Sequence, residues 1–299
     1  MKEIDTISIL KHNIPDFIKD TLNPYRAFRN PWRRINVIKA DDRVENLERF
    51  TDLCFIHDQL ELKKLLQKKL SKYYSVIVNE PGFLYCPAIN TDVILVAHLD
   101  TVHPEPVQTI YKGFSGGEHI FWSPEGIGGD DRCGIWMILD ILNTTDYRPG
   151  IVLCEDEEIG GRGALKFGQY LGELNELDPD GFRTKFFIEL DRAGKNDAVF
   201  YDCYNSDFIY HILDKTGLSI KRGSFSDISY ICPMVDRAGV NISCGYYNEH
   251  SKMHCAVEEH MNSTISKVKK LLKGVSAAPE FNYFTDDPYE MEDDYEYLW

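Results

Sequence analysis

Residues 92–100 read DVILVAHLD, a nearly unbroken apolar run that ends with a histidine and an aspartate. Such a run is typical of a central strand that is covered on both faces of a sheet. Further strands are predicted for GIVLC (150–154), KFFIELD (185–191), AVFYDC (198–203) and NISCGY (241–246). Apolar spacing predicts helices at 134–142, 162–171, 206–215, 224–232 and 256–272. Strands that alternate with helices predict a doubly wound α/β fold, with a mixed, mostly parallel sheet and helices on both faces.

By composition, the chain divides into three parts. Residues 1–73 form an N-terminal segment, and we expect its helix-like stretch, 44–72, to pack on the central domain. The central domain spans 74–276 and begins with two short β-type runs, YSVIV and GFLYC, that resemble a hairpin. Residues 277–299 form a tail rich in acidic and aromatic side chains.

The overall composition narrows the class of protein. The chain has 299 residues, of which 43% are hydrophobic and 27% charged, and its longest apolar runs have the length of strands. We therefore expect no membrane span and, without a signal-like N-terminus, a cytoplasmic protein. Eight scattered cysteines without a CxxC pair predict free thiols. The net charge of −15 argues against a dedicated nucleic-acid binder.

Acidic residues and histidines gather where the predicted strands end. HLD (98–100), EDEE (155–158) and ELD (189–191) each close or follow an apolar run. GGDD (128–131) precedes a predicted helix, and NEHS (248–251) follows another strand. Ligands of doubly wound sheets bind beyond the carboxyl ends of the strands, so we expect these motifs to converge there.

Carboxylates that converge need a compensating charge. Like charges raise each other's pKa, and a bound cation relieves that cost. With His98 and His250 present, a mixed nitrogen and oxygen site favours a divalent metal, zinc first. Two metals would need a shared carboxylate, which Asp130 in its glycine-flanked turn could supply. His98 and Asp100 lie two apart on a strand, so they face the same side, as suits a histidine ligand and the carboxylate that orients it.

HLD, GGDDRCG, DEEIGGRGA, LDRAG and NEHS occur in the order found in the co-catalytic di-zinc exopeptidases, the clan of peptidase T, zinc carboxypeptidases and leucyl aminopeptidases. The chain resembles that clan over roughly residues 92–270. The resemblance implies two divalent metal ions, zinc first with cobalt or manganese as alternatives. It implies a cis peptide at 130–131 and five metal ligands, with Asp130 as the bridge: His98, Asp130, Glu158, Asp191 and His250. It also implies that Asp100 orients His98 and that Glu157 is the general base.

Two features depart from the family pattern. Peptidase T-like members carry a lid domain between the last aspartate and the last histidine, and the stretch from Asp191 to His250 is too short for one. We therefore expect a single catalytic domain without a lid, as in the aminopeptidase-like branch. The family's final motif often has an acid soon after the histidine, whereas Ser251 to His254 follow here.

The resemblance predicts a metal-dependent hydrolase that cleaves amide bonds, first of all an exopeptidase or aminopeptidase. A metal-bridging water would attack the scissile carbonyl, and Glu157 would accept the proton of that water. Two alternatives are a deacylase of N-acyl amino acids or related small molecules, and a non-catalytic metal-binding interaction module. The expected partner is thus a peptide or an N-acylated small molecule, with no membrane, no nucleic acid, and the oligomeric state left open.

Several assignments have competitors within the same motifs. Asp131 competes with Asp130 for the bridge, Glu189 with Asp191, and both His254 and His260 with His250. We expect His103 to be structural or to face the substrate, and Cys133 to have a packing role. An aminopeptidase needs a carboxylate for the substrate ammonium and a carboxypeptidase a basic residue for the carboxylate. For the second task the sequence offers four arginines: Arg132, Arg162, Arg192 and Arg222.

The two ends of the chain lie outside the resemblance. NPYRAFRNPWRR (23–34) interleaves arginines with aromatic residues, a pattern that can stack on bases. PEFNYFTDDPYEMEDDYEYLW (279–299) is acidic and aromatic without a basic residue. So many aromatic side chains argue against simple disorder. We expect this tail to dock, either on the arginine segment or on a partner.

Overall fold

An eight-stranded sheet runs through the middle of the molecule. The structure is a computed structural model that describes residues 36–41 and 43–285. The sheet order is β10-β9-β11-β8-β4-β7-β3-β2. In that order the strands are β10 (Ser219–Ile220), β9 (Asp197–Val199), β11 (Gly239–Ser243), β8 (Phe186–Arg192), β4 (Thr91–His98), β7 (Pro149–Cys154), β3 (Phe83–Cys86) and β2 (Val78–Glu80). The four central strands, β11 to β7, are parallel to one another, whereas β3 pairs antiparallel with β7 and β9 antiparallel with β11.

The apolar run at 92–100 forms β4 in the centre of this sheet. Its side chains alternate between two hydrophobic cores, because successive strand residues point to opposite faces. Leu95 and Ala97 belong to one core, and Ile94 and Val96 to the other. All four are fully buried, as expected for a strand covered on both faces.

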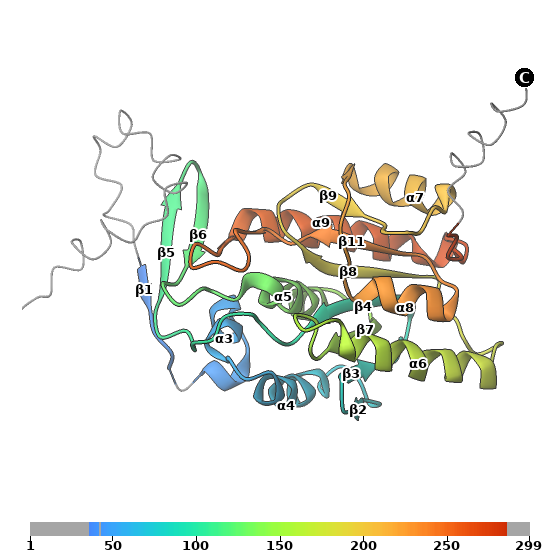
Figure 1. Ribbon diagram of the computed structural model, residues 1–299, viewed down its shortest axis with the longest axis horizontal. Coiled ribbons are helices and arrows are strands. Elements are labelled where there is room, and N and C mark those ends of the chain that lie inside the picture. The colour runs from blue at the N-terminus through green and yellow to red at the C-terminus, as the bar shows by residue number, and fades with distance from the viewer. Residues whose placement is uncertain (1–35, 42, 286–299) are drawn as a thin grey trace, which may run out of the picture.

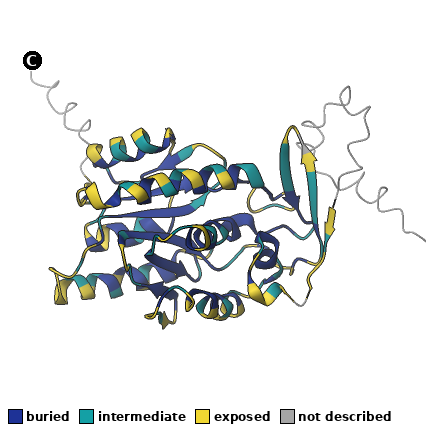
Figure 2. Cartoon of the chain, turned by 180° about the vertical axis from the view of Figure 1, so that it is seen from behind, coloured by how far each residue is buried: buried dark blue, intermediate teal, exposed yellow. Residues whose placement is uncertain are grey.

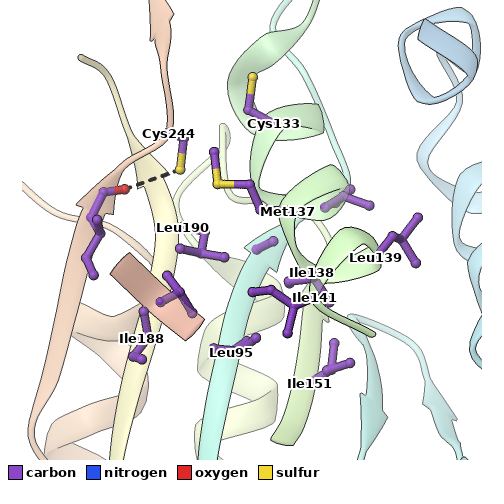
Figure 3. Close-up of a cluster of buried hydrophobic side chains, with 14 of the residues drawn as sticks. Leu95, Cys133, Met137, Ile138, Leu139, Ile141, Ile151, Ile188, Leu190 and Cys244 are labelled. Atoms are coloured by element: carbon purple, nitrogen blue, oxygen red, sulfur yellow. Dashed lines mark hydrogen bonds between the residues drawn. The ribbon is translucent and has the colours of Figure 1, made fainter. Parts of the chain in front are cut away.

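Helices cover both faces of the sheet (Figure 1). One core receives side chains from α3 (Phe50–Phe55), α4 (Gln59–Leu70), α5 (Gly129–Thr144), α7 (Ser206–Thr216) and α9 (Glu258–Gly274). The opposite core receives them from α6 (Arg162–Leu177) and α8 (Asp227–Val235). Figure 3 shows the first core, where Met137, Ile138 and Ile141 of α5 lie over the sheet. Figure 2 shows the resulting burial, with dark strands inside and exposed helix faces outside. The predicted doubly wound, mostly parallel fold is confirmed.

A second, smaller sheet was not predicted. Its order is β1-β5-β6-β13-β12, and every pair in it is antiparallel. The strands are β1 (Asn36–Ile38), β5 (Ile110–Ser115), β6 (Glu118–Trp122), β13 (Cys255–Val257) and β12 (Tyr246–Tyr247). It lies at one end of the molecule (Figure 1). Because β12 and β13 flank the segment that carries His250, this sheet holds one side of the candidate site.

The helix-like stretch 44–72 is a series of shorter helices. A 3-10 turn (Val44–Asn46) comes first, then α3, and α4 begins after the N-cap Asp58, whose side chain accepts a hydrogen bond from the backbone N–H of Glu61. Extended backbone at Ile56 separates α3 from α4. The predicted hairpin at 74–86 is present as β2 and β3, with its first strand starting later than expected. The domain boundaries at 73 and 276 stay predictions.

No separate lid is present between Asp191 and His250. All residues of that stretch are described, and they form strands and helices of the two sheets and their covering layers. Within the described part of the chain, no helix is both long and apolar enough to cross a membrane. The arginine-rich segment 23–34 and residues 286–299 lie outside the described residues.

Candidate metal centre

The five residues expected as metal ligands come together at the carboxyl edge of the central strands. His98 ends β4, Asp191 lies near the end of β8, and Glu158 follows β7. Asp130 lies in the first turn of α5, and His250 lies in the loop between β12 and β13. Two groups of three ligand atoms result, each with all atoms within 4.8 Å of one another: His98, Asp130 and Asp191; and Asp130, Glu158 and His250.

The spacing within each group matches that of metal ligands. Nε2 of His98 lies 2.8 Å from Oδ1 of Asp130 and 3.6 Å from Oδ1 of Asp191. Nε2 of His250 lies 3.2 Å from Oε2 of Glu158 and 3.5 Å from Oδ2 of Asp130. Two ligands that each lie about 2 Å from a tetrahedral zinc ion are ~3.3 Å apart. The two oxygens of Asp130 face different groups, as a carboxylate shared by two cations requires.

Asp100 connects the two sides of the site. Its Oδ1 lies 3.1 Å from Nδ1 of His98, the ring nitrogen turned away from Asp130. The backbone N–H groups of Glu157 and Glu158 donate to its two carboxylate oxygens at 3.0 Å each. A single carboxylate thus orients the histidine of one group and holds the loop that carries the glutamate of the other.

The two adjacent aspartates of the glycine-rich turn have different surroundings. The peptide bond between Asp130 and Asp131 is cis. Asp131 is fully buried and accepts from the backbone N–H groups of His98 (3.2 Å) and Gly134 (2.9 Å). A Cβ atom on Gly134 would lie 2.6 Å from that carboxylate and 2.1 Å from the carbonyl oxygen of Leu190. Asp131 therefore anchors the turn to β4, and Asp130 faces both histidines.

Asp191 is held by neighbours that the sequence analysis did not identify. The hydroxyl of Tyr246 donates to Oδ1 of Asp191 at 3.2 Å, and that of Ser226 donates to Oδ2 at 3.3 Å. Asn241 accepts from the backbone N–H of Asp191 and donates to its carbonyl oxygen, both at 3.0 Å. These partners come from β12, the start of α8 and β11, so no local sequence pattern links them to Asp191.

Burial and neighbouring charges shift the pKa values of several candidate ligands. Burial raises the pKa of Asp191 to about 7, with Asp130 adding to the effect. Burial alone would lower the pKa of His98, but Asp191, Asp100 and Asp130 raise it well above its usual value. A hydrogen bond to Asp130 raises the pKa of His250 to about 9. Shifts of this kind arise where charged groups are buried close to one another, as at many functional sites.

The donor set fits divalent cations. Oε1 of Glu158 is buried without a hydrogen-bond partner in the described part of the chain. An orphaned, buried carboxylate oxygen is costly unless a further ligand or a cation contacts it. With three carboxylates and two imidazoles, the site offers the oxygen and nitrogen ligands that zinc and related metals accept.

Glu157 lies beside these groups and lines the same cavity. It is largely buried, and burial raises its pKa to about 8, with His98 acting in the opposite direction and Asp191 in the same direction. The cavity has a volume of about 230 Å³ and is also lined by four of the candidate ligands: Asp130, Glu158, Asp191 and His250.

The residues that compete with His250 and Asp191 lie outside both ligand groups. His254 and His103 are buried and hydrogen-bonded to each other, Nδ1 to Nε2, at 3.0 Å. His260 contacts Glu118 and the hydroxyl of Tyr247 at 2.7 Å each. Glu189 is buried outside both groups of three, and neither of its carboxylate oxygens has a partner among the described residues.

Two further buried groups belong to the surroundings of the site. Cys133 is fully buried, and burial raises the pKa of its thiol well above the usual value, so a nucleophilic role is not favoured. Asp227, in the first turn of α8, is fully buried with both carboxylate oxygens unpartnered in the described part of the chain. Asp227 was not among the predicted site residues, although Ser226-Asp227 before an apolar run is a helix-start signal.

Comparisons with known proteins place the fold. Neither the protein-family models nor the curated proteins contain a match. Solved structures do match, among them aminopeptidase PepT from Bacillus cereus, with 15% identity and a TM-score of 0.58 over 80% of this chain and 99% of that one. A tripeptidase from Staphylococcus aureus matches with 13% identity and a TM-score of 0.59 over 80% of this chain and 100% of that one. A TET aminopeptidase from a marine sediment archaeon of the Thaumarchaeota matches with 12% identity and a TM-score of 0.55 over 78% and 97%. The chain therefore has the fold of these aminopeptidases, and the resemblance found in the sequence is confirmed at the level of fold.

Proposed function

We propose that this protein is a metal-dependent hydrolase that cleaves an amide bond, first of all as an exopeptidase on short peptides. The observation that carries the proposal is the pair of ligand groups that share Asp130, with Glu157 in the same cavity. The fold of the similar solved structures, which are named as aminopeptidases and a tripeptidase, supports the same class of reaction.

Each side chain has a role in this proposal. His98, Asp130 and Asp191 would hold one cation, and Asp130, Glu158 and His250 a second, with zinc the first candidate and cobalt or manganese alternatives. Bound cations would activate a water molecule and polarise the scissile carbonyl. Asp100 keeps His98 in one tautomer and orientation, because its carboxylate accepts the Nδ1–H.

Glu157 is the proposed general base. It would accept a proton on the attack step and deliver that proton to the leaving amine. Its place in the cavity and its burial suit this task, because a base that is shielded from bulk water keeps the proton for the leaving group.

A Glu157→Gln variant tests the proposal. Amino-acid anilides and short peptides would be incubated with the protein and added zinc, cobalt or manganese. We expect the wild type to hydrolyse at least one of them and the variant to lose about 10²- to 10⁴-fold in kcat at unchanged metal content. Glu173→Gln, an exposed position on α6, is the matched control and should keep full activity.

The two alternatives predict different results. Turnover of N-acyl amino acids without turnover of peptides would indicate a deacylase. No turnover of either class by the metal-loaded protein, or equal activity of wild type and Glu157→Gln, would contradict the hydrolase and favour an interaction module.

A further inference from the structure

One arginine lines the cavity beside the candidate metal centre. Of the four arginines that follow site motifs in the sequence, Arg132 is fully buried and donates to the backbone carbonyls of Leu99, Asp100 and Ile56. Arg162 and Arg222 are exposed and do not belong to the cavity lining. Arg192 does line it, together with Glu157 and Glu158.

A β-bulge places the side chain of Arg192 on the same face of the sheet as that of Glu189. Glu189 pairs with Asn241 of β11, and Arg192 pairs with Ser243, so three steps along β8 match two steps along β11. Asn241 and Ser243, two apart on a strand, face the same side, and their partners Glu189 and Arg192 therefore do so as well. Without the bulge, Arg192 would follow Leu190 into the opposite core. Bulges next to active sites commonly re-aim a side chain in this way.

Arg192 has no charge partner among the residues that the structure describes. Its Nε is buried and lacks a hydrogen-bond acceptor, and within residues 36–41 and 43–285 its guanidinium forms no ion pair. Five carboxylates line the same cavity, those of Asp130, Glu157, Glu158, Asp191 and Glu249, and none of them pairs with it. A partly buried guanidinium that is left unpaired costs free energy, which an anionic ligand would offset.

We propose that Arg192 binds the free carboxylate of the substrate. This inference rests on the proposed amide hydrolysis and names its substrate class: a short peptide or an N-acyl amino acid that ends in a carboxylate near the scissile bond. A guanidinium binds a carboxylate through two parallel N–H···O bonds, so it fixes orientation as well as charge. The cavity volume of about 230 Å³ is below the ~300–1,000 Å³ of pockets for drug-sized ligands and suits such a small substrate.

The test compares each acid with its amide. The substrates are leucyl-leucine and leucyl-leucine amide, and the variants are Arg192→Gln and Arg192→Lys in the metal-loaded protein. We expect Arg192→Gln to lower kcat/KM for the free acid about 10- to 100-fold, mainly through KM, and to leave the amide unchanged. Arg192→Lys should fall between, because lysine keeps the charge and loses the fork. Arg183→Gln removes an arginine at the opposite end of the sheet, where it pairs with Asp92, and should change neither substrate.

The outcome separates this inference from the proposed function. Equal losses on acid and amide, or no loss on either, would overturn the role of Arg192 while peptide hydrolysis itself stands. Comparing turnover of leucyl-leucine with that of N-acetyl-leucine shows whether the carboxylate that Arg192 binds belongs to a short peptide or to an N-acyl amino acid.

A binding measurement tests the role of Arg192 even if neither substrate is hydrolysed. Calorimetric titration of metal-loaded Glu157→Gln with leucyl-leucine should show tighter binding than with the amide, and Arg192→Gln in that background should abolish the difference. Equal affinity for acid and amide would overturn the inference.

Discussion

Asp100 contacts three groups of the candidate metal centre, although it is not itself a candidate ligand. Its carboxylate contacts Nδ1 of His98 and the backbone N–H groups of Glu157 and Glu158. Partners of this kind fix the orientation of a ligand and contribute to metal affinity without contacting the metal.

We expect Asp100→Asn to weaken metal binding about 10- to 100-fold, because the amide no longer provides the negative charge and two acceptor oxygens. Competition with a chromophoric chelator measures the affinity. Asp92→Asn, on the other end of β4, where Asp92 pairs with Arg183, is the control. Equal affinities of Asp100→Asn and wild type would show that Asp100 does not support the site.

Metal binding should release protons and should strengthen as the pH rises. Among the candidate ligands, the pKa of His250 is raised to about 9 and that of Asp191 to about 7, so without a cation His250 carries a proton at neutral pH and Asp191 is partly protonated. A cation must displace protons from its ligands, so its affinity falls as the pH drops below these values. Calorimetry in buffers of different ionisation enthalpy, from about pH 6 to about pH 9, counts the released protons. A pH-independent affinity would contradict the assignment of His250 as a ligand.

The sequence could predict that the candidate ligands lie close together, because most of them lie at strand ends. His98, Glu158 and Asp191 each close or follow an apolar run, and topology brings such ends to one edge. Tyr246 and Ser226 were missed, because they reach Asp191 only through tertiary structure. Likewise, the choice among the arginines depended on a bulge that leaves no local pattern in the sequence.

At the scale of elements, α4 is joined to the loop after β7 by a buried ion pair. Nζ of Lys63 lies 2.5 Å from Oε1 of Glu155 and donates to the backbone carbonyl of Glu80 at 2.6 Å. Oε2 of Glu155 also accepts from the backbone N–H of Gly82. This pair connects the predicted N-terminal segment with the loop that carries Glu157 and Glu158.

Breaking this pair from one side should destabilise the fold. We expect Lys63→Met to lower the free energy of unfolding by ~3 kcal/mol, because Glu155 is then buried without its partner. Lys63→Met combined with Glu155→Leu should recover part of the loss, since no buried charge remains. Lys64→Met, at an exposed neighbouring position, should change stability by at most about 0.5 kcal/mol. Urea denaturation measures all three, and a neutral Lys63→Met would show that the pair contributes nothing.

Strands with strong apolar runs were predicted more reliably than short, half-exposed ones. The central strands β4, β7 and β8 match the predicted stretches closely because both of their faces are buried. The β5–β6 hairpin was missed, although Gly116-Gly117 between two β-type runs is a hairpin signal. Only part of the predicted strand 198–203 forms, since the chain turns after Val199.

At the scale of the whole molecule, the chain returns to the central sheet near its C-terminus. The backbone N–H of Phe281 donates to the carbonyl of Lys185, and its carbonyl accepts from Ala238, just before β8 and β11 respectively. The ring of Phe281 packs against Phe186 and Phe208, with centroids 5.9 and 5.3 Å apart. Residues 279–285 of the predicted tail thus dock on the sheet and α7.

We expect Phe281→Ala to lower the free energy of unfolding by about 3–5 kcal/mol, because it leaves a cavity among buried aromatic rings. Phe284→Ala should cost about 0.5 kcal/mol or less, since that side chain is 52% exposed. Thermal and urea unfolding compare the two variants. Similar stabilities would show that the docked segment does not support the core.

The most direct test of the account is the number of metal ions bound per chain. Zinc titration by calorimetry, with metal analysis after dialysis, should give two ions per wild-type chain. Asp130→Ala should lose both, because Asp130 belongs to both ligand groups, whereas His250→Ala should keep one. A wild-type chain that binds no divalent metal, or binding that is unchanged in Asp130→Ala, would contradict the shared metal centre.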